Sequence, residues 1–480
     1  MYKKHDGQIT IAEFYSPFGN LDPKNRWVQV ANLIPWSHLE ERYAQQFCND
    51  NGAPAINFRM ALGTLIIKQM TGHSDDIVIQ DILENPYMQF LIGLHEFTIK
   101  APFAQSSVTN FRKYISADML AEANEYIFGK RNSDDNDNPP TDGVDNNEES
   151  PKQSDKPNRG TLMHDATCTP ANIGYPTDVN LLNEAREKLE GIVDVLYPYS
   201  ANRVKPRTYR NNARRDYMSF SKVRKPRKKS IHKAIKRQLQ YVKRTLGHVD
   251  SLIKEVGENH LTLRQKEWLF TIRKLYQQQQ DMYTSGSHSV QNRIVSISQP
   301  HVRPIVRGKV KAPVEFGAKV SISLIDGYAY VDKIGWNGYS EESLLIPAIE
   351  QYKALHGYYP EAVLADKIYR NRSNLNYCKE RNIRLSGPKL GRPSKDTVKQ
   401  SKKQEKQDSS ERNAVEGKFG EGKTKYGLNR IMAQLKDSSE TVIMMSFFCM
   451  NISKRLRSLL QHFLLMIDYG MKIENSMVFE

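Results

Sequence analysis

A stretch with almost no aliphatic side chains divides the chain into two parts. Residues 132–158 contain eight acidic residues and a single aliphatic residue, Val144. A segment of this composition cannot bury enough apolar surface to offset the entropy that it would lose on folding. We therefore predict that residues 131–159 form an acidic disordered linker, and that the folded parts of the chain lie on either side of it.

The part before the linker, residues 1–130, has the pattern of a compact, all-α domain. Apolar side chains recur at helical spacing in three stretches, residues 54–71, 75–83 and 86–94. A further helix is expected over residues 108–128, with Ser106 or Ser107 as its N-cap. The domain could include a helix-turn-helix, although three-helix packing is also common in proteins that do not bind DNA.

The part after the linker alternates between strands and helices. Strands are expected at residues 161–169, 361–367 and 383–385, and a hairpin begins near Gly317 with its turn at Asp326–Gly327. Helices are expected at residues 178–196, 225–245, 261–283, 341–356, 372–381, 411–435 and 440–465. The polar residues 391–410 indicate a mobile loop. This order predicts a mixed α/β sheet with helices on its faces, spanning residues 160–465.

A long helical insertion, at about residues 178–305, separates the first strand from the hairpin. Insertions in surface loops are tolerated, so the strand and the hairpin can still be neighbours in one sheet. The insertion contains residues 203–244, which carry seventeen Lys and Arg side chains and one acid, Asp216. The net charge of this run equals the +16 of the whole chain, so the remainder is close to neutral.

The basic run points to an anionic partner. Four aromatic residues are interleaved with its cations, namely Tyr209, Tyr217, Phe220 and Tyr241. Such a stretch fits contacts to phosphates together with stacking of rings on bases, which is typical of nucleic-acid binding. The alternatives are a solvated helix face or a targeting patch.

Several classes of protein do not fit the chain. The longest apolar run near the C-terminus, residues 441–450, is much shorter than the roughly 18–20 residues that a membrane span needs. No apolar run follows the first lysines, so no secretory signal is visible. The four cysteines are scattered without CxxC spacing, which disfavours a zinc site or a disulfide framework. We expect a cytoplasmic protein with no membrane partner.

Three acidic residues stand out by their surroundings. Asp165 lies within an otherwise uncharged strand, and Asp366 follows another strand at the end where open α/β sheets place their sites. Glu416 shares one face of an expected helix with Arg412 and Lys423. Three convergent carboxylates would suit Mg²⁺, which prefers oxygen ligands. Taken singly, each acid is also compatible with a helix cap or a surface group.

Other chemistry finds less support in the sequence. Residues 387–392 lack a Walker pattern, and no GxSxG or HExxH motif occurs. His164 and Cys168 are four residues apart on a strand, or about 13 Å, so we interpret them as core or supporting residues. His301 could contact DNA or orient a ligand, but an ordinary loop position is the simpler interpretation.

Several long blocks, in order along the chain, resemble bacterial insertion-sequence transposases of the IS4/IS5 superfamily, most closely the IS5-like group. The N-terminal block is FRMALGTLIIKQMTGHSDDIVIQDILENPYMQFLIGL. The block around the first acid is HDATCTPANIGYPTDVNLLNEAREKLE, and YPEAVLADKIYRNRSN contains the second. The last block is RNAVEGKFGEGKTKYGLNRIMAQL, around the glutamate.

The resemblance implies an RNase H-like catalytic domain with a DDE triad that binds two Mg²⁺ ions, for which Mn²⁺ can substitute. Carried over by motif, the triad is Asp165, Asp366 and Glu416. The superfamily signature Tyr-x₂-Arg-x₃-Glu-x₆-Lys is matched by Arg412, Glu416 and Lys423. Its tyrosine position is Ser409 here, so a tyrosine contact to DNA is not carried over.

The implied activity is metal-dependent cleavage at the ends of a mobile element, followed by strand transfer into target DNA. The partners would be double-stranded DNA, as terminal inverted repeats and target, with a homodimer on paired ends associated with the nucleoid. We expect DNA contacts from Arg412, Lys423, Arg207, Arg214, Arg215, Arg224, Lys225, Arg227, Lys228 and Lys229. The alternatives are a domesticated or inactive transposase that only binds DNA, and a basic RNA-binding scaffold.

Overall fold

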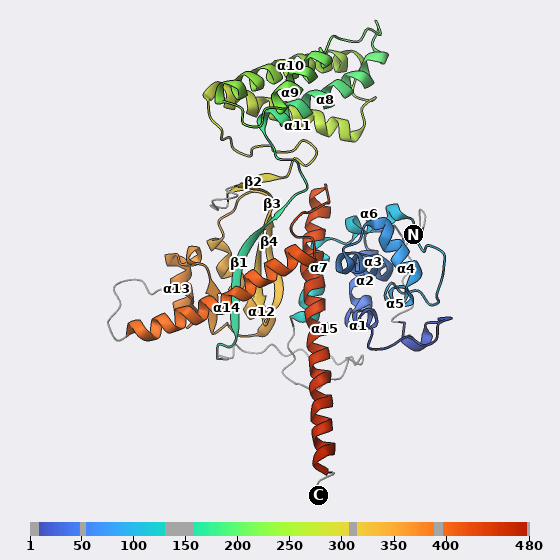
Figure 1. Ribbon diagram of the computed structural model, residues 1–480, viewed down its shortest axis with the longest axis vertical. Helices are drawn as coiled ribbons and strands as arrows, with labels where there is room; N and C mark the ends of the chain where they lie inside the picture. Colours follow the sequence, from blue (N-terminus) through green and yellow to red (C-terminus); the bar gives the residue numbers. More distant parts are fainter. Residues whose placement is uncertain (1–8, 49–53, 130–156, 307–313, 388–396, 478–480) are drawn as a thin grey trace.

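The computed structural model describes residues 9–48, 54–129, 157–306, 314–387 and 397–477, without the side chains of 397–401 and 460–477. Figure 1 shows three parts: a group of N-terminal helices, a sheet with flanking helices, and a separate helical bundle. Most of the predicted linker lies outside the described residues, so its order is not tested. None of the described helices is both long and apolar enough to cross a membrane.

Helices make up the N-terminal part. They are η1 (Ile11–Glu13), α1 (Arg26–Leu33), α2 (Trp36–Ala44), α3 (Phe58–Thr71), α4 (Asp75–Glu84), α5 (Pro86–Leu91), α6 (Gln105–Tyr114) and α7 (Ala117–Phe128). The single helix predicted over 108–128 is wrong, because the backbone is extended at Ile115 and Ser116. The Ser116 side chain accepts a hydrogen bond from the Met119 N–H, as expected of an N-cap, and so starts a new helix.

A six-stranded mixed sheet lies at the centre of the molecule. Its strands are β1 (Thr161–Pro170), β2 (Arg303–Val306), β3 (Val314–Ile325), β4 (Tyr328–Gly335), β5 (Ala362–Ala365) and β6 (Arg384–Leu385). The order is β2-β3-β1-β5-β6, and β4 also pairs with β3. β1 is antiparallel to β3 and parallel to β5, so the mixed α/β prediction and the pairing of the first strand with the hairpin are confirmed.

Sequence reasoning found the hairpin turn but missed a strand. Asp326 and Gly327 both adopt positive φ angles, 50° and 77°, as a two-residue hairpin turn requires. No strand was predicted at β2. This strand is only four residues long and contains Pro304, so it carries little strand signal of its own and depends on pairing with β3.

Helices cover both faces of the sheet. One face packs against α12 (Leu345–His356), preceded by η3 (Glu342–Leu344), and α13 (Arg372–Glu380). The other face belongs to a cluster that includes α14 (Thr397–Lys425), α15 (Lys436–Met477) and the N-terminal helices. The N-terminal helices therefore share a hydrophobic core with the sheet and with α15.

Two predictions near the C-terminus are corrected. Residues 397–410, expected within a mobile loop at 391–410, belong to helix α14, while 391–396 lie outside the described residues. The polar side chains there include Lys, Gln and Glu, which favour helices even without an apolar stripe. Helix α14 ends at Lys425 rather than at residue 435, close to Gly427 with its φ angle of 70°.

The insertion is a helical bundle with its own core. It contains α8 (Asp178–Leu196), η2 (Tyr197–Tyr199), α9 (Arg210–Ser221), α10 (Lys228–Val256) and α11 (Leu263–Ser285). Apolar side chains of α8, α10 and α11 form a cluster separate from those of the sheet. Helix α8 has its predicted bounds and is capped by Thr177, whose side chain accepts a hydrogen bond from the Asn180 N–H.

The chain leaves and re-enters the sheet on the two sides of one glycine. Pro170, at the end of β1, and Arg303, at the start of β2, both pair with Gly317 on β3. A Cβ atom at position 317 would lie 2.1 Å from the Thr169 carbonyl oxygen, so only glycine fits there. The Gln299 side-chain amide also donates to the Asn172 carbonyl, which ties the two connecting segments together.

Candidate functional site

The two aspartates lie next to each other at the carboxyl end of β5, beside β1. The parallel pairing of β1 with β5 ends with His164 opposite Ala365. Asp165 and Asp366 are the next residue of each strand, so their backbones are neighbours. β5 stops there, whereas β1 continues to Pro170 along β3. The end of β5 therefore leaves an open edge beside Asp165.

Asp366 begins a short turn of helix directly after β5. It is the N-cap of η4 (Lys367–Tyr369), and its Oδ1 accepts a hydrogen bond of 2.7 Å from the Lys367 N–H. The side chain is 54% exposed. Its second oxygen makes no described hydrogen bond and remains available to a ligand at the surface.

Asp165 is the more buried carboxylate, with 18% of its side chain exposed. Burial raises its pKa above the ordinary value, and the negative charges of Glu341 and Asp366 raise the pKa further. A hydrogen bond from the Ala166 N–H, 2.8 Å long, and the positive charge of Arg412 act in the opposite direction. Asp165 thus lies in a crowded, electronegative corner of the sheet.

Helix α14 brings Glu416 and Arg412 to the same corner. The Arg412 Nη1 atom lies 3.6 Å from Asp165 Oδ2 and 3.8 Å from Asp366 Oδ1. Its Nη2 atom lies 3.9 Å from Glu416 Oε1, one helical turn away. A single guanidinium is therefore in ion-pair contact with all three carboxylates that the sequence analysis singled out. Lys423 is half-buried in the last turn of the same helix.

The carboxylates do not form a finished metal site. Within the described residues, no three His, Cys, Asp or Glu side chains are grouped closely enough to hold an ion. The donor chemistry nevertheless suits a hard divalent cation, because three carboxylates share one guanidinium and leave excess negative charge. Coordination would require the side chains to close around an ion and Arg412 to give up part of its contacts.

A fourth carboxylate, Glu341, was missed by sequence reasoning. It lies just before η3, and its charge contributes to the raised pKa of Asp165. Its side chain contacts Lys319 and Tyr369. The local sequence offers no signal for this position, because an acid before a helix is usually explained by the helix dipole.

None of the two histidines and the cysteine considered earlier is exposed. His164 and Cys168 are fully buried, as expected of core residues. His164 Nδ1 lies 3.2 Å from Asp332 Oδ2, and its ring meets Tyr369 edge-on. His301 packs against Trp336, and burial, with the charges of Arg303 and Lys436, lowers its pKa to about 4.

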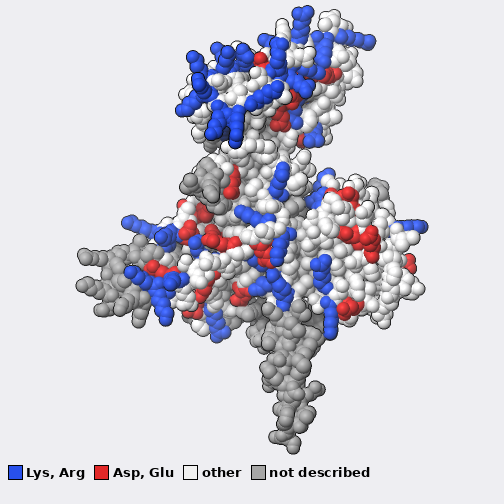
Figure 2. All heavy atoms as spheres, viewed as in Figure 1, with Lys and Arg blue, Asp and Glu red and all other residues white. Residues whose placement is uncertain are grey.

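The basic run covers the surface of the insertion. Of its seventeen cations only Arg210 is half-buried and the rest are exposed, among them the expected DNA contacts Arg207, Arg214, Arg215, Arg224, Lys225, Arg227, Lys228 and Lys229. Figure 2 shows Lys and Arg side chains gathered over this bundle. The one acid of the run, Asp216, pairs with Arg237 and accepts a hydrogen bond from Tyr241, so it offsets little of the surface charge.

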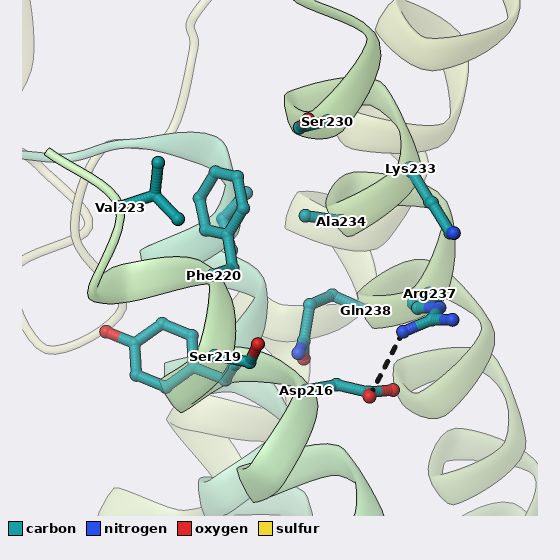
Figure 3. A pocket seen from close by; sticks show the side chains of 11 residues that line it. Asp216, Ser219, Phe220, Val223, Ser230, Lys233, Ala234, Arg237 and Gln238 are labelled. Carbon is teal, nitrogen blue, oxygen red and sulfur yellow. Dashed lines mark hydrogen bonds and ion pairs between the residues drawn. The ribbon is translucent and has the colours of Figure 1, made fainter. Parts of the chain in front are cut away.

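A cleft of about 250 Å³ opens between α9 and α10 within this surface (Figure 3). Phe220 and Val223 line one side, and Lys233 and Arg237 line the other. Gln238 extends between the two helices and is almost completely buried. Its amide oxygen has no hydrogen-bond partner among the described residues. The basic surface is therefore hollowed rather than flat.

Comparison with known proteins links two segments of the chain to transposases. Residues 17–114 match a transposase domain (DUF772), and residues 363–453 match a transposase DDE domain. The second match includes Asp366, Arg412, Glu416 and Lys423. Neither match extends to Asp165 or to the insertion.

One curated relative is an uncharacterised protein, ORF8 in the nfe locus of Rhizobium meliloti. It is 33% identical over 102 residues, which is 21% of this chain and 49% of the relative, so the chain matches about half the relative's length. No solved structure matches the chain significantly. The chain is therefore similar to a transposase domain over its N-terminal helices and to a transposase DDE domain from β5 to α15.

Proposed function

We propose that this protein is an IS5-like transposase that cuts DNA at the ends of an insertion sequence and joins them to target DNA. The observation that carries the proposal is the meeting of Asp165, Asp366 and Glu416 around Arg412 at the open edge of the sheet. Strands β4, β3 and β1 pair antiparallel, and β5 and β6 continue the sheet with parallel pairing, an order that supports an RNase H-like catalytic domain, residues 160–465. Residues 1–130 would form the domain that reads the terminal repeats.

Two divalent ions, Mg²⁺ or in its place Mn²⁺, fit the donor set of this site. Asp165 and Asp366 would share them, and Glu416 would complete the second. Such ions would activate the attacking oxygen and stabilise the leaving one. Arg412 already lies among the carboxylates and can turn its free donors toward a phosphate, and Lys423 on the same helix would hold a second phosphate.

The insertion would supply most of the affinity for DNA. Arg227, Lys228 and Lys229 lie at the N-terminus of α10, where no acidic side chain is present in the first turn. The positive end of the helix dipole repels cations at this end of a helix, and the cations also repel one another. An anion bound there reduces both repulsions. The phosphates of double-stranded DNA would supply such anions along the whole basic run.

The test is a cleavage assay on a plasmid that carries the reading frame with its flanking DNA. Asp165→Asn, Asp366→Asn and Glu416→Gln should each lower Mg²⁺-dependent nicking by at least about 1000-fold. DNA binding should change by less than about threefold, because the triad is not the main source of affinity. Nicking at the ends and binding by gel shift are the two measurements.

Glu361→Gln is the matched control, since Glu361 is an exposed acid at the opposite end of β5. It should cut like the unmodified protein. Undiminished cleavage by Asp366→Asn would contradict the proposed triad. DNA binding by the unmodified protein without any metal-dependent nicking would instead favour a DNA-binding protein derived from a transposase. Pairing of two ends by a homodimer would appear as a slower band that contains both ends.

A further inference from the structure

Glu341 is held in place by contacts from two sides. On one side its Oε1 lies 2.6 Å from Lys319 Nζ, on strand β3. On the other its Oε2 accepts a hydrogen bond of 3.3 Å from the Tyr369 hydroxyl. The Glu341 and Lys319 side chains are each about one-fifth exposed or less. The carboxylate is therefore fixed between β3 and the segment that follows β5.

Tyr369 connects Glu341 to the turn that carries Asp366. It is the last residue of η4, its side chain is completely buried, and its N–H donates to the Asp366 carbonyl. The Asn374 side chain reinforces the connection by donating to the carbonyls of both Glu342 and Tyr369. Movement of Tyr369 would therefore be passed directly to the Asp366 backbone.

Lys319 anchors the other end of this chain of contacts. It lies on β3, the strand that pairs with β1, and it also donates to the Tyr339 carbonyl at 2.9 Å. The ammonium group lies 4.7 Å from the centre of the Tyr339 ring. Lys319 is thus fixed independently of Glu341 and can serve as a firm support for it.

We propose that Glu341 is a positioning residue of the transposase site, which ties the Asp366 turn to β3 through Tyr369 and Lys319 and so sets the spacing of Asp366 from Asp165. This inference rests on the proposed function, because it assigns Glu341 a role toward that triad. Asp165 is attached to the same frame through β1 and β3. Without Glu341, the turn after β5 would be tied to β3 by weaker contacts alone.

The first measurement does not depend on metal or DNA. Hydrogen exchange of the peptide that spans η4 is compared in the full-length protein and three variants: Glu341→Ala, Glu341→Gln and Tyr369→Phe. The alanine and phenylalanine variants should exchange faster there, by at least about fivefold, because each breaks the contact to the turn. The glutamine variant keeps an acceptor for the tyrosine and should lie close to the unmodified protein.

The second measurement is Mn²⁺ binding by the full-length protein, followed by electron paramagnetic resonance. Loss of a group that orients a metal ligand typically weakens binding 10–100-fold. Glu341→Ala and Tyr369→Phe should each weaken Mn²⁺ binding by about tenfold, with partial rescue in Glu341→Gln. Glu342→Gln is the control. It removes the same charge from the neighbouring residue, whose side chain is hydrogen-bonded to Ser340.

The outcomes separate the inference from the proposed function. Unchanged exchange in Glu341→Ala would overturn the inference whatever the metal result. Faster exchange with unchanged Mn²⁺ affinity would overturn it too, since Glu341 would then only support the fold. If Asp165→Asn binds Mn²⁺ as well as the unmodified protein does, the proposed function fails and the positioning role fails with it.

Discussion

Asp75 shows how one side chain can hold three N-terminal helices together. It starts α4, lies 2.6 Å from Lys68 on α3, and accepts two hydrogen bonds from Arg112 on α6. Burial alone would raise its pKa, but Arg112 and Lys68 outweigh burial and lower the pKa to about 2. The folded protein therefore gains stability from the ionised form of Asp75.

Asp75→Asn should reduce the free energy of opening of α4 by about 1–2 kcal/mol at about pH 6. Because the folded pKa is depressed, the contribution of Asp75 is present above the ordinary pKa of an aspartate and is lost as the pH falls toward 2. The difference between the variant and the unmodified protein should therefore shrink at about pH 3. Hydrogen exchange of α4 peptides measures it.

Asp76→Asn serves as the control for Asp75→Asn, since Asp76 is exposed and is hydrogen-bonded to Ser74 within its own turn. It should leave α4 nearly unchanged at both pH values. An equal effect of the two substitutions would mean that the ion pairs with Lys68 and Arg112 add nothing beyond the helix dipole.

At the level of single residues, sequence reasoning identified acids with a distinct local context. Asp165 interrupts an uncharged strand and Asp366 ends one, and both lie at the open edge. Glu341 could not be found in this way, because its neighbours Lys319 and Tyr369 are 22 and 28 residues away. Nor could the central place of Arg412, since it depends on how α14 crosses the sheet.

Helix α14 is the element on which the site depends most, and one buried ion pair anchors it. Asp408 has only 5% of its side chain exposed and lies 2.6 Å from Arg384 Nη1 on β6. Gln404, one turn earlier on the helix, donates to the other oxygen of Asp408. Arg412 and Glu416 follow Asp408 at intervals of four residues, so the anchor and the site share one face of the helix.

Reversal of either charge should release the first half of α14. Asp408→Arg and Arg384→Asp should each lower nicking by about 10- to 100-fold, because an unpaired buried charge is costly and the helix would move away. The double variant should recover most of the activity with the pair rebuilt in reverse. Nicking rates and hydrogen exchange of α14 are the readouts.

Lys406→Asp is the control for this element, as it reverses an exposed charge half a turn from Asp408. Its activity should stay within about twofold of the unmodified protein. Failure of the double variant to recover, while both single variants remain folded, would show that α14 is held by contacts other than this pair.

Among elements, those with a clear period or turn signal were predicted well. Helix α8 and the β3–β4 hairpin are examples. The first half of α14 was misread because its polar composition was taken as a loop signal, whereas an ion pair to β6 stabilises it as a helix. Helices α6 and α7 were merged because Ser116, a strong cap residue, lies within a continuous apolar pattern.

On the scale of the whole molecule, charge and chemistry occupy different parts. The exposed cations of residues 203–244 lie on the insertion, where Figure 2 shows Lys and Arg side chains gathered, while Asp165, Asp366 and Glu416 lie on β1, after β5 and on α14. Replacement of Arg224, Lys225, Arg227, Lys228 and Lys229 by Gln should therefore weaken DNA binding strongly. If all five contact phosphates, the slope of log affinity against log salt should flatten by about 4.5.

A control with five exposed cations outside residues 203–244 tests whether membership of the basic run matters: Lys113 and Lys379, and Lys254, Arg264 and Lys274 from the rest of the insertion. Their replacement by Gln removes the same charge and should change the salt slope by less than about 1. Equal slopes for the two sets would mean that net charge alone attracts DNA. The basic run would then be interpreted as a solvated helix face. Binding titrations at four or more salt concentrations give the slopes.

The place of the insertion between the first strand and the hairpin could be foreseen from the order of the expected elements, whereas the predicted division at residues 132–158 stays a prediction. The shared core of the N-terminal helices with α15 could not, because it joins residues more than 300 positions apart, such as Asn124 and Asn451. Contacts at that separation leave no local pattern in either segment.

The insertion leaves the sheet at Pro170 and returns at Arg303, and both residues flank Gly317. A unit that is joined to the sheet at two neighbouring points can change without a change in the rest of the sheet. It can be lengthened, shortened or exchanged in evolution while the strands that bear the aspartates keep their pairing. If the insertion binds DNA and the carboxylates cut it, as proposed, the choice of DNA and the cutting of DNA would be able to diversify at independent rates within one gene.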